Sequence, residues 1–558
     1  MPDSACDTPL FGDDGGRVYV YMPSVQGKVS YKTLRQKIVS SDFADIHQPS
    51  SKYLNGPWAM KVGKRYFLFY AENYAENYAD SYWTGVAYTD HPLGLWRNAA
   101  VHPRPFVRRP VRYRGRRQRR VWRADGNAGH GSLAQEIGRL SMSSLPVTVQ
   151  EIEEAYAQLQ GVIDCTPLQL NPRLSEQFGA EIYLKREDLQ IVRSYKIRGA
   201  YNLMSSLTEE ERAQGVVCAS AGNHAQGVAF SCRRLQIQGR IYMPENTPRQ
   251  KVERVRTLGG AWIATVLVGD TFDDTSRAAA QYARDTQKVF VPPFDDPRII
   301  AGQGTVGIEI AAQMETPPDY LVVPVGGGGL LSGLAVYAAA NFPKAHLVGA
   351  EPLGAACLYA ALQAGHPVTL PTVDTFVDGA AVKTVGETNF AICRELIPEV
   401  LRVSEGKVCT EMIGLYQNEG IIAEPAGALG IAALPQLGER LRGKKVVCIV
   451  SGGNNDISRY PEVIERSLID QGLKHYFLVE FSQRPGALRR YLDEALGPND
   501  DITLFEYIKK SNREYGPALV GVELADKNDF RPLLKRMEGI GLSFEVIGRD
   551  SALFRFVL

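Results

Sequence analysis

Four consecutive glycines, Gly326 to Gly329, follow the apolar run Leu321 to Val325, and this pairing restricts the fold more than any other feature. Glycine weakens a regular helix or strand because it loses more backbone entropy on folding than other residues. Placed directly after a buried strand, however, the glycines let successive N–H groups converge on an anion. We therefore predict a buried strand and a phosphate-binding turn. The spacing differs from G-x-G-x-x-G and from G-x-x-x-x-G-K-[ST], which argues against nucleotide binding.

The same succession of apolar run and turn recurs elsewhere in the chain. Short β-branched runs at 182–184, 215–218 and 446–450 end in glycine-rich or small-residue turns, and residues 149–159 show helical spacing. Strands that alternate with helices indicate an α/β fold with a parallel sheet, which binds ligands at the carboxyl ends of its strands.

Three further motifs carry chemical groups. Lys196 lies in S-Y-K-I-R-G-A, Ser220 begins S-A-G-N-H-A-Q-G, and Ser451 begins S-G-G-N-N-D. We expect Gly452, Gly453 and Asn454 to start a helix, with a capped turn as the alternative. A lysine that forms a Schiff base must lose its proton, and the segment after Lys196 suits a helix N-terminus close to a phosphate. The turn at 220–224 predicts an anion site for a carboxylate, with an ordinary helix cap as the alternative.

Together these segments resemble the threonine/serine dehydratase branch of the fold type II (tryptophan-synthase-β-like) pyridoxal phosphate enzymes, in particular biosynthetic threonine ammonia-lyases. The resemblance spans about residues 143–558 and implies a two-lobed α/β enzyme. It implies that Lys196 bonds to pyridoxal 5′-phosphate and removes the Cα proton of the substrate. The remaining implied sites are the phosphate cradle (Gly326, Gly327, Gly328, Gly329 and Leu330), the contact to the cofactor 3′-oxygen (Asn223), the contact to the pyridine nitrogen (Ser451) and the substrate carboxylate loop (Ser220, Ala221, Gly222, Asn223 and His224).

The resemblance implies that threonine is converted to 2-oxobutanoate and ammonia, the committing step of isoleucine synthesis. Serine dehydratase, serine racemase and β-replacement synthases are alternatives within the superfamily, because the threonine methyl group distinguishes substrates by only about 1–3 kcal/mol. Glu309, Glu351 and Asp378 lie in segments that also resemble dehydratases. Each is either a structural carboxylate or a group that supports the site, and the sequence does not call for a metal.

Residues 474–558 differ from the preceding region in their pattern of expected strands and helices. They predict the order β-α-β-β-α-β of a ferredoxin-like α+β domain. With the turn R-P-G-A-L at 484–488, this region resembles the ACT-like regulatory domain of threonine dehydratases. That resemblance implies feedback control by isoleucine, with valine as an opposing ligand, and a homotetramer. We assign 142–466 to the catalytic domain.

Residues 1–141 are interpreted as an atypical β-rich extension, either a fused remnant or a mistranslated segment. The alternation of residue types at 64–71 and 85–88 predicts strands. Residues 56–96 resemble one blade of a glycosidase-type propeller. A single blade is too small a part of a propeller to form a glycosidase. Arg104 to Arg123 includes ten arginines and no acidic residue. We interpret it as a solvated linker, with nucleic-acid binding as the alternative function class.

The formal net charge is +1, so the chain as a whole has no strong electrostatic attraction to nucleic acid or membranes. A length of 558 residues predicts three or four domains. Eight scattered cysteines without a C-x-x-C pair indicate thiols in a reducing compartment. The N-terminus lacks the pattern of a signal peptide, and we expect a cytoplasmic protein.

Overall fold

A computed structural model describes residues 145–507, 514–548, 551, 553 and 554, together with strands between residues 10 and 98. The chain divides into two compact units, Met1–Ala128 and Gly129–Leu558.

The first unit contains two antiparallel four-stranded sheets, each with its strands in chain order. They consist of β1 (Leu10–Gly12), β2 (Val18–Pro23), β3 (Val29–Arg35) and β4 (Ile38–Ile46), and of β5 (Leu54–Val62), β6 (Arg65–Asn73), β7 (Tyr82–Thr89) and β8 (Arg97–Asn98). The strands predicted at 64–71 and 85–88 are confirmed as β6 and β7, whereas the first sheet was not predicted. The arginine-rich run 104–123 lies outside the described residues.

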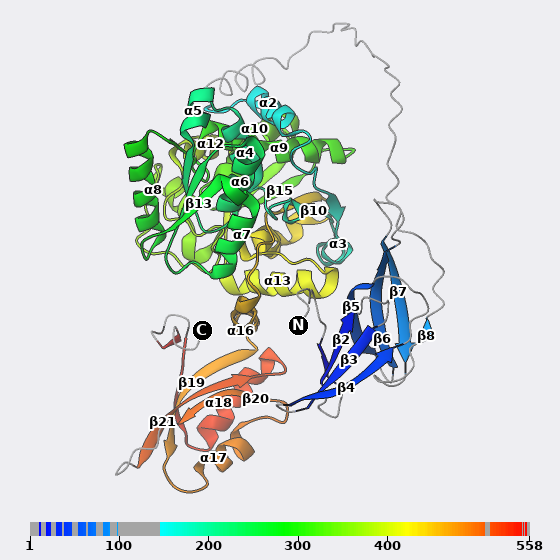
Figure 1. The fold of residues 1–558 in the computed structure, drawn as a ribbon. Coiled ribbons are helices and arrows are strands. Elements are labelled where there is room, and N and C mark those ends of the chain that lie inside the picture. The colour runs from blue at the N-terminus through cyan, green and yellow to red at the C-terminus, as the bar shows by residue number, and fades with distance from the viewer. Residues whose placement is uncertain are drawn as a thin grey trace. The chain divides into compact units, whose positions relative to one another are not determined.

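The larger sheet of the second unit has the strand order β17-β16-β15-β18-β10-β9, and Figure 1 labels its strands β15 and β10. Its neighbouring strands are parallel except for β9 and β10. The strands are β9 (Leu168–Leu170), β10 (Glu181–Arg186), β15 (Tyr320–Pro324), β16 (His346–Pro352), β17 (Glu399–Val403) and β18 (Lys445–Val450). Leu321 and Val323 pack into one core with Ile449, and Val322 packs into the opposite core with Val446. Burial of both faces explains why these strands are apolar throughout.

A smaller parallel sheet has the order β13-β12-β11-β14. Its strands are β11 (Val216–Ala219), β12 (Gly239–Met243), β13 (Ile263–Leu267) and β14 (Val289–Phe290). Val216 and Cys218 pack into one core, and Val217 and Ala219 pack into another. Both predicted strands, 182–184 and 215–218, are therefore confirmed in parallel sheets, but in two different ones.

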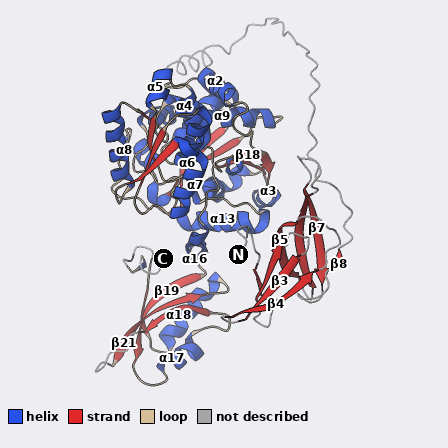
Figure 2. Ribbon diagram, viewed as in Figure 1, coloured by secondary structure: helices blue, strands red, loops and turns tan. Residues whose placement is uncertain are grey.

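Helices cover these two sheets (Figure 2). They are α2 (Val149–Leu159), α3 (Pro172–Phe178), α4 (Lys196–Ser205), α5 (Glu209–Gln214), α6 (Asn223–Leu235), α7 (Arg249–Gly259), α8 (Phe272–Thr286), α9 (Pro297–Gln313), α10 (Gly329–Asn341), α11 (Cys357–Ala364), α12 (Glu387–Leu396), α13 (Glu405–Glu419), α14 (Pro425–Ala432), α15 (Leu434–Leu437) and α16 (Tyr460–Gln471). The helix predicted at 149–159 is confirmed, and it begins where Thr148 and Glu151 form a capping box.

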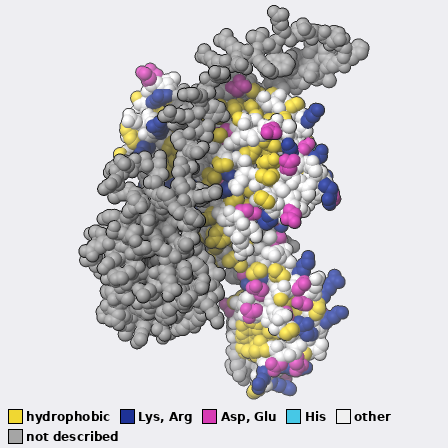
Figure 3. Space-filling view, turned by 90° about the vertical axis from the view of Figure 1, so that its right-hand side faces the viewer, with side chains coloured by type: hydrophobic (Ala, Val, Ile, Leu, Met, Phe, Trp, Pro, Cys, Tyr) yellow, Lys and Arg dark blue, Asp and Glu magenta, His cyan; other side chains and the backbone are white. Residues whose placement is uncertain are grey.

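The face of the molecule in Figure 3 carries charges of both signs. Lysine and arginine side chains are interspersed there with aspartate and glutamate side chains. Among the described residues, every helix is too short or too polar to cross a membrane.

The C-terminal part forms an antiparallel sheet with the order β20-β21-β19-β22. Its elements are β19 (Lys474–Ser482), α17 (Ala487–Arg490), β20 (Asp501–Tyr507), β21 (Tyr515–Glu523), α18 (Phe530–Gly539) and β22 (Ser543–Val546). The predicted order β-α-β-β-α-β is thus confirmed. Phe477 and Val520 of the sheet pack against Leu533 and Met537 of α18, which gives this part its own core.

One helix start differs from the prediction. Residues 452–454 form a loop instead of a helix, and α16 begins only at Tyr460. The loop is held in place because Gly453 N–H donates to the Arg193 carbonyl at 2.9 Å. In the C-terminal part, the turn at 484–488 includes Gly486 with φ +90°, and α17 begins directly after it at Ala487. A π-helical turn, 491–495, follows it.

Candidate active site

Lys196 is the first residue of α4 and is half-buried. Its Nζ donates to the Pro293 carbonyl at 2.7 Å and lies 6.0 Å from the centre of the Phe294 ring. Burial lowers the pKa of Lys196 to about 8, and the nearby Glu424 carboxylate partly opposes this shift. A larger fraction of the amine is therefore neutral near pH 7 than for an exposed lysine, as nucleophilic chemistry requires.

The tetraglycine turn lies between the end of β15 and the start of α10. A Cβ on Gly327 would come within 2.3 Å of the Phe294 ring, and Gly328 has φ +99°, so side chains are excluded here. Within the described residues, the N–H groups of Gly326, Gly327 and Gly328 donate no hydrogen bond. Because Phe294 follows Pro293, the same segment contacts both Lys196 and this turn. Free N–H groups at the start of a helix fit a phosphate group.

The loop 220–224 joins β11 to α6, which begins at Asn223 as predicted. Ser220 N–H donates to the Tyr242 carbonyl at 3.0 Å, and Gly222 N–H donates to Ser220 Oγ at 3.2 Å. The N–H groups of Ala221, Asn223 and His224 have no acceptor in the part of the chain that the structure describes. They form a small cluster of donors that fits a carboxylate.

His224 is buried, and its Nε2 lies 2.9 Å from the Val291 carbonyl. Burial, together with the positive charge of Lys196, lowers the pKa of His224 to about 3. The imidazole is therefore neutral at pH 7, which suits packing rather than proton transfer.

Ser451 follows β18 and lies beside the lysine segment. Its carbonyl accepts a hydrogen bond from Tyr195 N–H at 3.1 Å, and Gly452 forms a bridge with Ser194. The Ser451 hydroxyl donates to the Ala426 carbonyl at 3.1 Å. Ser194 Oγ is buried and has no hydrogen-bond partner among the described residues. An unsatisfied hydroxyl beside Lys196 is consistent with a polar group that binds there.

Asn223 links the loop at 220–224 to the loop at 451–456. Its Nδ2 donates to Glu424 Oε1 at 2.6 Å, and its Oδ1 accepts from Asn454 Nδ2 at 2.7 Å. The structure thus brings together all four predicted segments, through Phe294, Ser194–Tyr195 and Asn454. Sequence reasoning missed Phe294 and Glu424, and it placed Asn454 at a helix start without its contact to Asn223. Only Glu424 has a local signal, because it precedes the small-residue run P-A-G-A-L-G (425–430).

The three supporting carboxylates have separate positions. Glu309 is buried between Lys185 and Arg198, at 2.6 and 2.8 Å. Arg198, two residues after Lys196, therefore lies in a buried ion cluster. Glu351 accepts hydrogen bonds from two N–H groups at the start of α11, both at 2.8 Å, and burial raises its pKa to about 7.

Asp378 forms an ion pair with Lys251 at 2.8 Å. Within the described residues, no three histidine, cysteine, aspartate or glutamate side chains are grouped to bind a metal.

Comparisons with known proteins identify the family. Residues 159–452 match the family of pyridoxal-phosphate-dependent enzymes, and residues 465–557 match the C-terminal regulatory domain of threonine dehydratase. A biosynthetic L-threonine dehydratase of Mycobacterium leprae is 54% identical over 415 residues, which are 74% of this chain and 97% of that protein. The chain belongs to the threonine dehydratase family.

Other relatives agree with this assignment. The biosynthetic L-threonine dehydratase of Bacillus subtilis is 52% identical over 412 residues, which cover 74% of this chain and 98% of that protein. Among solved structures, the processed form of threonine deaminase isoform 2 from Solanum lycopersicum is 39% identical with a TM-score of 0.53. That match covers 61% of this chain and 95% of the tomato chain. The family is that of a pyridoxal-phosphate-dependent lyase, and the cofactor expected from the sequence is confirmed at this level.

Proposed function

We propose that this protein is an L-threonine dehydratase, which converts threonine to 2-oxobutanoate and ammonia in isoleucine biosynthesis. The observation that supports the proposal is a chain of contacts: Phe294 links the Lys196 amine to the turn with the free N–H groups of 326–328, and the Glu424 carboxylate acts on both Lys196 and the Asn223 amide. The identity of 54% to a biosynthetic threonine dehydratase supports the same activity.

Pyridoxal 5′-phosphate, when bound, withdraws electrons from the Cα of the amino-acid substrate. Lys196 would hold the cofactor covalently and, once released, take the Cα proton. Its lowered pKa of about 8 favours the neutral amine needed for both tasks. Gly326–Gly329 and Leu330 would hold the cofactor phosphate through their N–H groups, because no side chain stands in the way.

The loop 220–224 would bind the substrate carboxylate through its free N–H groups, with His224 as a neutral packing residue. Asn223 would donate to the 3′-oxygen of the cofactor. Ser451 would face the pyridine nitrogen, its hydroxyl turning from the Ala426 carbonyl. A hydroxyl there, unlike a carboxylate, leaves the nitrogen neutral, which favours elimination over transamination.

In this proposal, three parts of the chain have different roles. Residues 142–466 carry out catalysis, residues 474–558 form an ACT-like regulatory domain, and residues 1–141 are an extension not needed for activity. A homotetramer lets ligand binding in one regulatory domain act across subunit contacts. The seven cysteines among the described residues are free, which supports a reducing cytoplasm.

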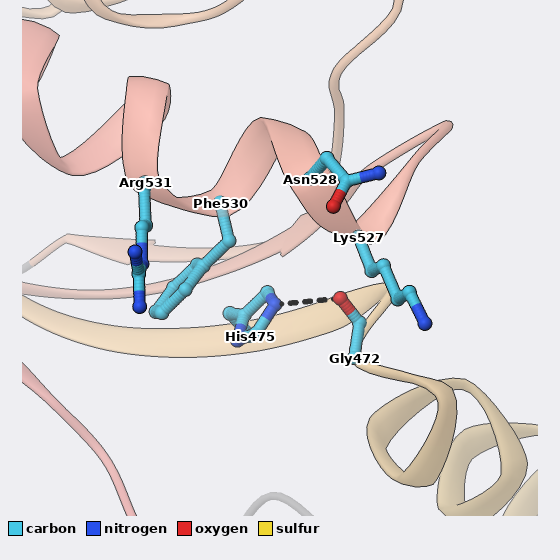
Figure 4. Close-up of a pocket in the computed structure, with 6 residues that line it drawn as sticks. All are labelled: Gly472, His475, Lys527, Asn528, Phe530 and Arg531. Atoms are coloured by element: carbon cyan, nitrogen blue, oxygen red, sulfur yellow. Dashed lines mark hydrogen bonds between the residues drawn. The ribbon is translucent and has the colours of Figure 1, made fainter.

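Two cavities in the C-terminal part are candidates for the effector. One, of about 380 Å³, is lined by Gly472, His475, Lys527, Asn528, Phe530 and Arg531 (Figure 4). In it the His475 ring stacks on Phe530 at 3.7 Å, and His475 Nε2 donates to the Gly472 carbonyl. Its other side chains are mostly polar or cationic.

The other cavity, of about 340 Å³, is lined by Phe481, Ser482, Gln483, Arg484, Pro485, Gly486, Ala487, Leu488, Phe505 and Tyr507. It combines aromatic and aliphatic walls with Arg484, which can pair with a carboxylate. A branched apolar amino acid needs both features. The cavity lies at the R-P-G-A-L turn, and we assign isoleucine to it, with valine as a competing ligand.

A substrate panel tests the proposed activity. Purified full-length protein with pyridoxal phosphate is expected to form an oxo acid from threonine, more slowly from serine, and without racemised serine as the main product. Oxo-acid formation is measured with and without isoleucine, which should inhibit. Serine racemisation faster than threonine turnover would replace this proposal with the racemase alternative.

The effector cavity is tested by Phe505→Ala. The substitution removes an aromatic wall, so we expect the isoleucine concentration for half-inhibition to rise about 10-fold or more, because a buried aromatic side chain contributes on the order of 2–4 kcal/mol to such contacts. Uninhibited threonine turnover should stay within about twofold. His475→Ala, in the other cavity, is the matched control. If His475→Ala weakens inhibition and Phe505→Ala does not, the effector binds in the first cavity.

A further inference from the structure

Glu424 is a buried carboxylate that sequence reasoning did not single out. It is 4% exposed and stands immediately before α14, where Pro425 is the first helical residue. At this position a side chain commonly caps its own helix, but the Glu424 side chain makes no such hydrogen bond. Its carboxylate is instead directed to the two loops of the site.

The two oxygens of Glu424 have different partners. Oε1 accepts from Asn223 Nδ2 at 2.6 Å, and Oε2 accepts from Asn454 N–H at 3.2 Å. A Cβ on Gly452 would come within 2.3 Å of Oε1, so the carboxylate packs against backbone that only glycine allows. The Gly452 carbonyl also accepts from Glu424 N–H at 3.1 Å. The carboxylate is therefore fixed on several sides.

We propose that Glu424 is a positioning residue, which, together with Asn454, holds the Asn223 amide in a single orientation. Rotating that amide by 180° would bring Asn223 Oδ1 against the Glu424 carboxylate and Asn223 Nδ2 against the Asn454 donor. Both contacts are repulsive. Asn454 cannot rotate either, because its Nδ2 also donates to the Val192 carbonyl at 2.8 Å.

The consequence concerns the second N–H of Asn223. Glu424 takes one of the two amide hydrogens, and the other stays free in a fixed direction. On the proposed function, that hydrogen serves the 3′-oxygen of the cofactor. The inference therefore rests on the proposed function for its role, but its geometry stands on the contacts alone.

Burial and the groups around Glu424 shift its pKa. Burial raises the pKa of Glu424 to about 7, and Asp378 adds to this, whereas Asn223, Lys251 and the Asn454 N–H oppose it. In turn, the Glu424 carboxylate opposes the lowering of the Lys196 pKa. Burial, together with the Glu424 carboxylate, raises the pKa of the Tyr195 hydroxyl. A neutral residue at 424 should therefore let the Lys196 pKa fall further.

The test uses Glu424→Ala, Glu424→Gln and Asn223→Ala, alone and combined, in the full-length protein. The apoprotein is titrated with pyridoxal phosphate, and the absorption spectrum gives both the dissociation constant and the environment of the bound cofactor. We expect Glu424→Ala to weaken binding about 10- to 100-fold and to shift the spectrum, as for loss of a hydrogen bond to a charged group. Glu411→Gln, a buried glutamate paired with Lys407 on α13, is the control and should change neither.

The double variant distinguishes positioning from general support. If Glu424 acts through Asn223, Glu424→Ala should add little in an Asn223→Ala background, because coupled residues are not additive. Full additivity, or an unchanged spectrum in both Glu424 variants, would overturn the proposal.

Glu424→Gln keeps one side-chain oxygen as a hydrogen-bond acceptor. It therefore still tests the proposal if the Glu424→Ala variant does not fold. With Glu424→Gln, the apoprotein should bind the cofactor at lower pH than the original protein does. These readouts need no threonine turnover, so a wrong substrate assignment would leave them valid.

Discussion

Replacing Lys196 with alanine is expected to reduce threonine turnover by at least about 10³-fold. A positioned acid or base contributes on the order of 10²–10⁴-fold, and Lys196 is assigned the covalent attachment of the cofactor as well. Its half-buried position, its contact with the Pro293 carbonyl and its lowered pKa support this double role. The measurement is the rate of oxo-acid formation with saturating threonine and pyridoxal phosphate.

Two controls make the result specific. Lys196→Arg keeps a positive charge but cannot bond to the cofactor, so it should be as inactive as Lys196→Ala. Lys344→Ala removes an exposed lysine from the same unit and should leave the rate unchanged. Turnover in Lys196→Ala above about one tenth of the original rate would contradict the assignment.

The parts of the site that could be predicted are those whose structural requirements involve only a few neighbouring residues. Gly326 to Gly329 after an apolar strand, and Asn223 at the start of a helix, reflect requirements of backbone geometry within a few residues. Such requirements are visible in the sequence. The turn at 326–329 was therefore placed correctly between its strand and its helix.

The contacts that hold the site together are not local. Glu424 and Asn223 are 201 residues apart in the chain, and Lys196 and Pro293 are 97 apart. No periodicity or turn signal links such pairs. The loop at 452–454 was expected to start a helix, and this expectation was wrong. In the structure, Asn454 instead donates to Val192 and Asn223.

Strands were easier to predict than sheets. The apolar runs at 182–184, 215–218 and 446–450 are confirmed as β10, β11 and β18. Their distribution over two sheets depends on which helices cover which faces, and the runs themselves do not reveal it. Likewise, the segment after Lys196 was expected to suit a helix N-terminus close to a phosphate, and α4 does begin at Lys196, but the Arg198 side chain points to a different partner set.

That partner set is a fully buried cluster of four charges. Arg198 of α4 makes two hydrogen bonds of 2.8 Å to Glu187 and one of 2.8 Å to Glu309. Lys185 of β10 binds the other oxygen of Glu309 at 2.6 Å. All four side chains are at most 1% exposed. Burial lowers the pKa of Arg198, but the two carboxylates outweigh it and raise the pKa above its usual value.

Arg198→Met is expected to lower the free energy of unfolding by about 3–5 kcal/mol, because it leaves Glu187 buried without a cation. Chemical denaturation followed by the absorbance of bound cofactor measures the loss. Arg249→Met, which breaks the exposed pair with Glu253, should lower it by no more than about 0.5 kcal/mol. Adding Glu187→Gln to Arg198→Met should recover part of the loss, since Lys185 and Glu309 remain a neutral pair. A loss below about 1 kcal/mol in Arg198→Met, or no recovery in the double variant, would show that this cluster does not anchor α4 and its first residue, Lys196.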